Sequence, residues 1–111
     1  MAGAKGVVVI RWSATPFRGD RFAEIWTPAA EAALRYGARG WALLRAKEGG
    51  ADFIQLAYFD SKLDFERYWY SEEIAAARTE AAGLFQVPVL PEFYELVGEG
   101  ALAEAEASVE A

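Results

Sequence analysis

The sequence predicts an α+β domain with the element order strand–helix–strand–strand–helix–strand. Extended runs of β-branched and aromatic residues alternate with two segments in which large apolar residues recur every three or four positions. A glycine pair, Gly49 and Gly50, separates the two middle runs, which is typical of a β-hairpin. With 111 residues, the chain is long enough for one domain with its own core.

The first strand is expected over residues 6–13, "GVVVIRWS". Alternation along a strand places Val8, Ile10 and Trp12 on one face. The opposite face carries Val7, Val9, Arg11 and Ser13. Because both faces are apolar at the start of this run, we expect a strand that is buried on both sides.

The first helix is expected to begin at Asp20, which would be its N-cap. Its apolar positions are Phe22, Ile25, Trp26, Ala29 and Ala33. Pro28 lies within this pattern. Either the helix is kinked there, or Thr27 caps a second segment with Pro28 at its first position. Gly37 is the expected C-terminal cap.

Residues 40–59 are expected to form the two strands of the hairpin. In the second of these strands, Phe53, Gln55, Ala57 and Phe59 alternate with Ile54, Leu56 and Tyr58. Neither face of this strand is plainly polar, so both are expected to be covered.

The second helical segment follows over residues 60–82 and ends at Gly83. Ser61, with Asp64 three positions later, has the spacing of a capping box and marks the start. Ser71, followed by two glutamates, is a second N-cap signal. We therefore expect the helix to break or bend at Ser71.

The final strand is expected from Phe93 to Val97, with Pro88 and Pro91 kept ahead of the ladder. These elements assign residues 1–98 to one folded domain. Residues 99–111 form an acidic tail rich in Ala and Glu, to which we assign no role.

This element order is that of the ferredoxin-like split βαβ fold, a four-stranded antiparallel sheet with two helices on one face. The other face carries Val, Leu and aromatic side chains, and the predicted elements leave nothing to cover it. Monomers tolerate exposed apolar patches of only a few hundred Å². We therefore expect a homodimer in which a second sheet covers this face, giving a dimeric α/β barrel.

The sequence contains 0 His and 0 Cys. These absences exclude disulfides, a zinc site of the Cys/His kind, a histidine general base, a cysteine nucleophile and a His-ligated haem. We find no dense Asp/Glu motif in the sequence that suggests a carboxylate metal site. We therefore expect neither a metal nor a cofactor.

The net charge is -6, and much of it sits in the tail. The rest of the sequence is nearly balanced and has no basic stripe, so nucleic acid is not an expected partner. No apolar run approaches the roughly 20 residues that span a bilayer. The N-terminus also lacks the order of a signal peptide. We expect no membrane partner and a cytoplasmic location.

Five large rings are expected to lie between the sheet and the helices. They are Trp12, Phe22, Trp26, Phe65 and Trp69. Either these rings pack fully against one another, or they wall a cavity that binds a substrate. Tyr68 lies on the flank of the same helical stripe, where its phenol either packs or lines a pocket, and Tyr70 points elsewhere.

Arg78 follows Tyr68 by ten residues, which leaves the two within roughly 80° of each other if the helix is continuous. They are the candidate catalytic pair, in which one side chain holds a substrate oxygen while the other stacks. The alternative for Arg78 is a solvated helix arginine. Arg11 and Arg45 lie inside strands and are expected to form ion pairs across the dimer interface.

The stretch "FDSKLDFERYWYSEEIAAAR" resembles the aromatic-x-Ser-x3-Phe motif and following helix of the antibiotic biosynthesis monooxygenase-like family. The matching positions are Phe59, Ser61, Phe65, Tyr68, Ser71 and Arg78. With the element order, the resemblance extends from residue 6 to about residue 98. It implies a dimeric α+β barrel with a pocket between the helices and the sheet of each subunit.

The family includes cofactor-independent oxygenases of polyphenolic substrates and haem-degrading oxygenases. Haem-degrading members place a Trp and a His where this chain has Tyr68 and Arg78, so the missing iron ligand argues against haem degradation. The resemblance implies a cofactor-independent monooxygenase that acts on a hydrophobic, aromatic small molecule. The alternatives are a non-catalytic ligand-binding or stress-associated barrel and an isomerase or cyclase that uses the same cavity.

Overall fold

A computed structural model describes residues 5–102 of the chain. Its strands are β1 (Gly6–Ser13), β2 (Gly40–Arg45), β3 (Asp52–Phe59) and β4 (Glu92–Glu95). Its helices are α1 (Gly19–Glu31), the 3₁₀ helix η1 (Ala32–Tyr36), α2 (Lys62–Trp69) and α3 (Glu72–Glu80). Most of the predicted acidic tail, residues 103–111, lies outside the described residues.

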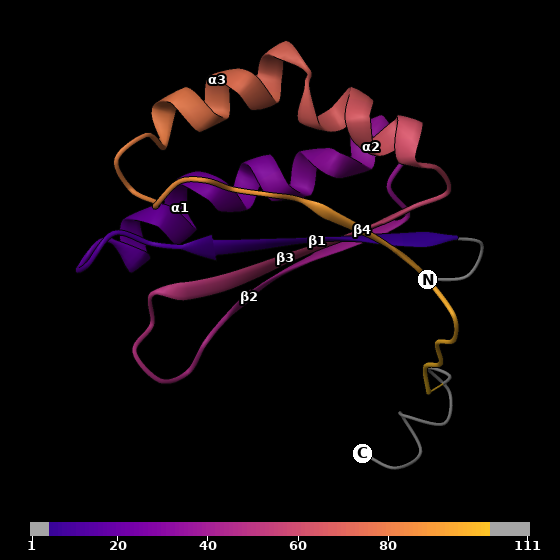
Figure 1. Ribbon diagram of the computed structural model, residues 1–111, viewed down its shortest axis with the longest axis horizontal. Coiled ribbons are helices and arrows are strands. Elements are labelled where there is room, and N and C mark those ends of the chain that lie inside the picture. The colour runs from indigo at the N-terminus through magenta and orange to yellow at the C-terminus, as the bar shows by residue number, and fades with distance from the viewer. Residues whose placement is uncertain (1–4, 103–111) are drawn as a thin grey trace.

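The four strands form one antiparallel sheet in the order β2-β3-β1-β4. The helices lie on one face of this sheet, and no helix of the described part lies on the other (Figure 1). The predicted α+β, ferredoxin-like fold is therefore confirmed. No helix in residues 5–102 has the length and apolar character needed to cross a membrane.

Helix α1 runs through Pro28 without a second N-cap. The Thr27 hydroxyl donates a hydrogen bond back to the carbonyl oxygen of Ala23 at 2.6 Å, so Thr27 belongs to the helix interior. The N-cap position is Arg18, two residues before the predicted cap Asp20, and the helix begins at Gly19. The 3₁₀ helix η1 follows α1 directly, and this helical segment ends at Gly37. The φ of Gly37 is 99°, as expected for the predicted glycine cap.

The second helical segment is divided into α2 and α3, as the serine signals predicted. The Ser61 hydroxyl accepts a hydrogen bond from the amide N of Asp64, and the Ser71 hydroxyl accepts one from the amide N of Ile74, both at 3.2 Å. Each serine satisfies an amide at a helix start that has no partner within the helix. Strand β4 is shorter than predicted and pairs only with Gly6–Val9 of β1.

The two faces of the sheet differ in what covers them. On the helix side, Val8, Ile10 and Trp12 of β1 are buried, as predicted. The alternate residues of the strands belong to the other face, which no helix covers and which we call the open face. By the strand register, they include Val7, Val9, Ala42, Leu44, Ile54, Leu56, Tyr58 and Tyr94. Arg11 lies on this face 3.6 Å from Glu92, so it has an ion-pair partner within its own chain.

Candidate functional site

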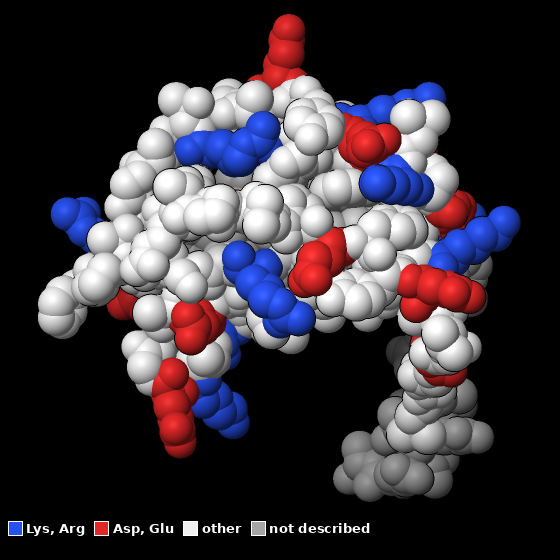
Figure 2. Space-filling model, in the orientation of Figure 1, with Lys and Arg blue, Asp and Glu red and all other residues white. Residues whose placement is uncertain are grey.

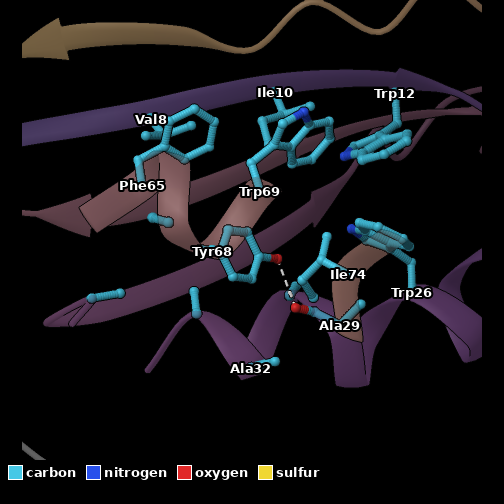
Figure 3. Close-up of a cluster of buried hydrophobic side chains, with 14 of the residues drawn as sticks. Val8, Ile10, Trp12, Trp26, Ala29, Ala32, Phe65, Tyr68, Trp69 and Ile74 are labelled. Atoms are coloured by element: carbon cyan, nitrogen blue, oxygen red, sulfur yellow. Dashed lines mark hydrogen bonds between the residues drawn. The ribbon is translucent and has the colours of Figure 1, made fainter. Parts of the chain in front are cut away.

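The rings that the sequence suggested for substrate binding meet in one cluster between the sheet and the helices (Figure 3). β1 contributes Trp12, α1 contributes Phe22 and Trp26, and α2 contributes Phe65 and Trp69. All five side chains are buried. The ring centroid of Trp12 lies 4.7 Å from that of Trp26 and 6.1 Å from that of Trp69. The rings are therefore in direct contact.

Gln55 on β3 supplies the polar centre of this cluster, and its side chain is fully buried. Its Oε1 accepts hydrogen bonds from the indole Nε1 of Trp26 at 2.8 Å and of Trp12 at 3.1 Å. Its Nε2 donates to the Tyr68 hydroxyl at 3.0 Å. Buried polar groups need such partners, and one glutamine satisfies two indoles and a phenol.

Tyr68 is held on both sides of its hydroxyl. It accepts the hydrogen bond from Gln55 and donates one to the carbonyl oxygen of Ala29 at 2.6 Å (Figure 3). Burial raises the pKa of Tyr68 to about 12, although the Gln55 hydrogen bond and the charge of Arg78 act in the opposite direction. At neutral pH Tyr68 is therefore an uncharged phenol, which donates a hydrogen bond and does not act as a base.

Arg78 lies on α3, beyond the break at Ser71, so it does not share a continuous helix with Tyr68. Its Nη1 donates to the carbonyl oxygen of Trp69 at 2.8 Å. Its guanidinium carbon lies 4.5 Å from the centroid of the Trp69 ring, within the range of a cation–π contact. Arg78 is half-buried and ties α3 to the end of α2, so it is not a freely solvated arginine.

The aromatic cluster is closed in this structure. Tyr68 is 0% exposed, and Trp12 only 1%. A molecule that enters the cluster has to displace at least one ring, because the rings fill the space between the sheet and the helices. The catalytic roles of Tyr68 and Arg78 and the substrate-binding roles of the five rings stay predictions.

A cavity of about 750 Å³ opens elsewhere, at the end of the sheet where β1 stops, α1 begins and the β2–β3 hairpin turns. It is lined by Ser13, Ala14, Pro16, Phe17, Gly19, Asp20, Arg45, Gly49, Ala51, Asp52 and Gln86. In this cavity Arg45 Nη1 lies 2.7 Å from Asp20 Oδ1. Arg45, like Arg11, therefore has an ion-pair partner within its own chain.

A smaller groove of about 330 Å³ lies between α1 and α3. Its apolar lining includes Ile25, Pro28 and Ala77, and its acidic lining consists of Glu24, Glu73 and Glu80. Glu73 already binds the Arg35 guanidinium and the Tyr36 hydroxyl. Within residues 5–102, no group of three or more Asp and Glu side chains is placed to hold a metal ion.

Sequence reasoning missed Gln55 as the centre of the cluster. A signal existed, because a glutamine on a strand face otherwise made of Phe and Ala needs buried partners, and Trp and Tyr side chains can supply them. The cavity residues Phe17 and Asp52 carried no such signal, since a loop and a hairpin turn have no periodicity that predicts which side chains meet.

Solved structures share this fold. A protein of unknown function from Nitrosomonas europaea is 23% identical, with a TM-score of 0.74 over 93% of this chain and 99% of that one. SnoaB, a cofactor-independent oxygenase from Streptomyces nogalater, is 16% identical, with a TM-score of 0.71 over 91% of this chain and 99% of that one. A candidate antibiotic biosynthesis monooxygenase, also from N. europaea, is 16% identical with a TM-score of 0.71, covering 88% and 99% of the two chains.

No family model matches the sequence, and no curated protein matches it closely. The structural likeness covers most of this chain and nearly all of each neighbour. It confirms the resemblance to the antibiotic biosynthesis monooxygenase-like family at the level of the fold.

Proposed function

We propose that this chain is a small homodimeric protein that acts on a hydrophobic, aromatic small molecule as a cofactor-independent monooxygenase. The observation that carries the proposal is the fold shared with SnoaB over 91% of this chain. A reaction in which an electron-rich substrate itself reduces dioxygen needs no metal ligand, and the sequence has 0 His and 0 Cys. The protein then has to supply a dry aromatic environment and a few polar groups.

The aromatic cluster supports this proposal through its chemistry. Tyr68 offers a neutral phenol within a ring-lined interior, and the charge of Arg78 acts on that phenol. In the proposed reaction Tyr68 positions a substrate oxygen by hydrogen bonding, and Arg78 stabilises negative charge that develops on the substrate. Since the cluster is closed, binding there requires at least one of its rings to move aside.

The homodimer is part of the proposal because of the open face of the sheet. Val9 and Leu56 are directly opposite each other at its centre, and Ala42 of β2 pairs with Leu56 from the other side. Burying such a face against a second sheet stabilises the dimer by about 25 cal/mol for each Å² of apolar surface that is removed from water. The polar side chains of this face in the described residues lie toward one end or edge of the sheet, as the ion pair between Arg11 and Glu92 and the pair Ser13 and Asp52, so the centre of the face is apolar.

A second candidate function, a non-catalytic barrel, is favoured by the closed cluster. The side chains of Gln55 and Tyr68 hydrogen-bond to groups of their own chain, so these bonds serve the core. In that case Arg78 has only its structural contacts to Trp69.

Dioxygen uptake with an anthrone as the probe distinguishes the two candidates. The wild-type protein is expected to accelerate uptake above the rate with heat-denatured protein, and Arg78→Ala is expected to abolish that acceleration. The matched control is Arg67→Ala, because Arg67 is an exposed arginine on α2. If no anthrone, quinone or flavin either raises the melting temperature or is turned over, the monooxygenase proposal fails and the non-catalytic candidate stands.

A further inference from the structure

The cavity at the end of the sheet has the size and lining of a ligand site, and it is separate from the aromatic cluster. It is lined by residues from the end of β1, the start of α1 and the β2–β3 hairpin turn. These segments lie at the left side of Figure 1. Its volume of about 750 Å³ is within the range of sites that hold small molecules. None of the five rings of the aromatic cluster lines it.

The exposed ring of Phe17 is the most unusual feature of this cavity. Its side chain is 105% exposed, and none of the ring pairs in the described residues includes it. Its φ is 66°, and the amide N of Arg18 closes the turn onto the carbonyl oxygen of Thr15 at 2.9 Å. Glycine or asparagine is preferred at a turn position with positive φ. The chain thus holds a large ring in water, in a backbone conformation that disfavours it.

The charges of the cavity leave one carboxylate unbalanced. Asp20 and Arg45 neutralise each other through their 2.7 Å contact. Asp52 is exposed, and its one side-chain contact in the described residues is a hydrogen bond at 3.4 Å from the Ser13 hydroxyl. A hydroxyl does not cancel the carboxylate charge, so the cavity has a net charge of about -1.

Arg45 is not available to attract an anion. Besides Asp20, it donates through Nε to the carbonyl oxygen of Gly50 at 2.8 Å, and its guanidinium lies 5.3 Å from the ring centroid of Phe53. Gly19 keeps this position open, because a Cβ there would lie 2.5 Å from Arg45 Nη2. The arginine is therefore held as part of the wall, and Asp52 remains to select the charge of a ligand.

We propose that this cavity binds a planar aromatic cation, with its rings on Phe17 and its positive charge toward Asp52. A cation attached to a flat ring system uses both features at once, through stacking on the exposed ring and Coulomb attraction to the carboxylate. Basic and acidic side chains are interspersed over the face of the molecule shown in Figure 2, so the attraction of a cation is assigned to the local carboxylate of Asp52. The inference rests on the cavity and is independent of the proposed monooxygenase function.

Fluorescence titration with 9-aminoacridine tests the proposal, because this probe is a planar cation at neutral pH. Acridine, which has the same ring system and is neutral at that pH, is the matched probe. We expect 9-aminoacridine to bind more tightly than acridine and its affinity to fall with added salt. Phe17→Gly and Asp52→Asn are each expected to weaken its binding about two- to fivefold.

Two control variants remove the same chemical groups elsewhere. Tyr70→Ala removes another exposed ring, and Glu31→Gln removes another exposed carboxylate charge, and neither residue lines the cavity. Both are expected to leave the affinity unchanged. Phe17→Gly is also expected to fold at least as well as the wild type, because glycine adopts a φ of 66° without strain. A melting temperature equal to that of the wild type would show that a loss of binding in this variant does not result from unfolding.

Amide chemical-shift mapping locates the bound probe. Shifts at Gly19, Gly49 and Ala51 on addition of 9-aminoacridine would support the site, since all three line the cavity. The proposal is overturned if acridine binds as tightly as 9-aminoacridine, if the control variants weaken binding as much as the cavity variants, or if the shifts map to another region.

Discussion

The side-chain amide of Gln55 donates a hydrogen bond to the hydroxyl of Tyr68 at 3.0 Å, which joins the middle of the sheet to helix α2. Through the same two residues, the sheet is also joined to α1, because Tyr68 donates to Ala29 and Gln55 accepts from Trp26. A buried polar group of this kind holds the layers in one arrangement. The physical consequences can be measured without knowing a substrate.

Gln55→Leu is expected to lower the free energy of unfolding by about 3 kcal/mol, because it leaves two buried indole N–H groups without an acceptor. Gln86→Leu is the control, since Gln86 is exposed, and its effect is expected to stay within about 0.5 kcal/mol. Urea unfolding followed by tryptophan fluorescence measures both. Equal stability of the two variants would show that the Gln55 hydrogen bonds do not hold the core together.

Tyr68 is expected to make the folded protein less stable in strong alkali. Its pKa is raised to about 12 in the folded state from the ordinary 10.0, so its contribution is complete below pH 10 and is lost as the pH rises toward 12. The difference corresponds to up to about 3 kcal/mol. In a titration followed by phenolate absorbance, one of the 5 tyrosines should ionise late, and Tyr68→Phe should remove that late step. Loss of a different step in this variant would contradict the prediction.

Arg78→Ala is expected to lower the free energy of unfolding by about 1–2 kcal/mol, because it removes both the hydrogen bond to Trp69 and the contact with its ring. Arg67→Ala, at an exposed position of α2, is expected to change it by less than about 0.5 kcal/mol. Both variants should keep the oligomeric state of the wild type. If Arg78→Ala is as stable as Arg67→Ala, then Arg78 does not tie α3 to α2 in solution.

Leu56→Asp is expected to convert the proposed dimer into a monomer, because it places a charge at the centre of the apolar sheet face. Leu63→Asp is the matched control, since Leu63 is an exposed leucine on α2, away from that face. Size-exclusion chromatography with light scattering compares the two variants. A dimer that survives Leu56→Asp would mean that the copies associate through another surface.

The order of the elements and the helix signals could be read from local sequence because they depend on neighbouring residues. Ser61 and Ser71 cap helices through amides only three positions away, and Gly37 supplies a positive φ. The burial of Trp12 and Trp26 likewise followed from periodicity.

Long-range contacts of side chains could not be read in this way. The packing that closes the aromatic cluster joins Gln55 to Trp12, 43 positions away. The ion pair between Asp20 and Arg45 spans 25 positions, and Asp20 lies in the first turn of α1 instead of capping it. The positive φ of Phe17 runs against the preference of its residue type, so local propensity gave no indication of it.

Sedimentation velocity of the 111-residue chain at micromolar concentration tests most directly whether a second copy covers the helix-free face of the sheet. A species of twice the 12.2 kDa chain mass is the predicted result. A stable 12.2 kDa monomer would contradict it, because the apolar face would then be exposed to water and the proposed shared barrel would not form.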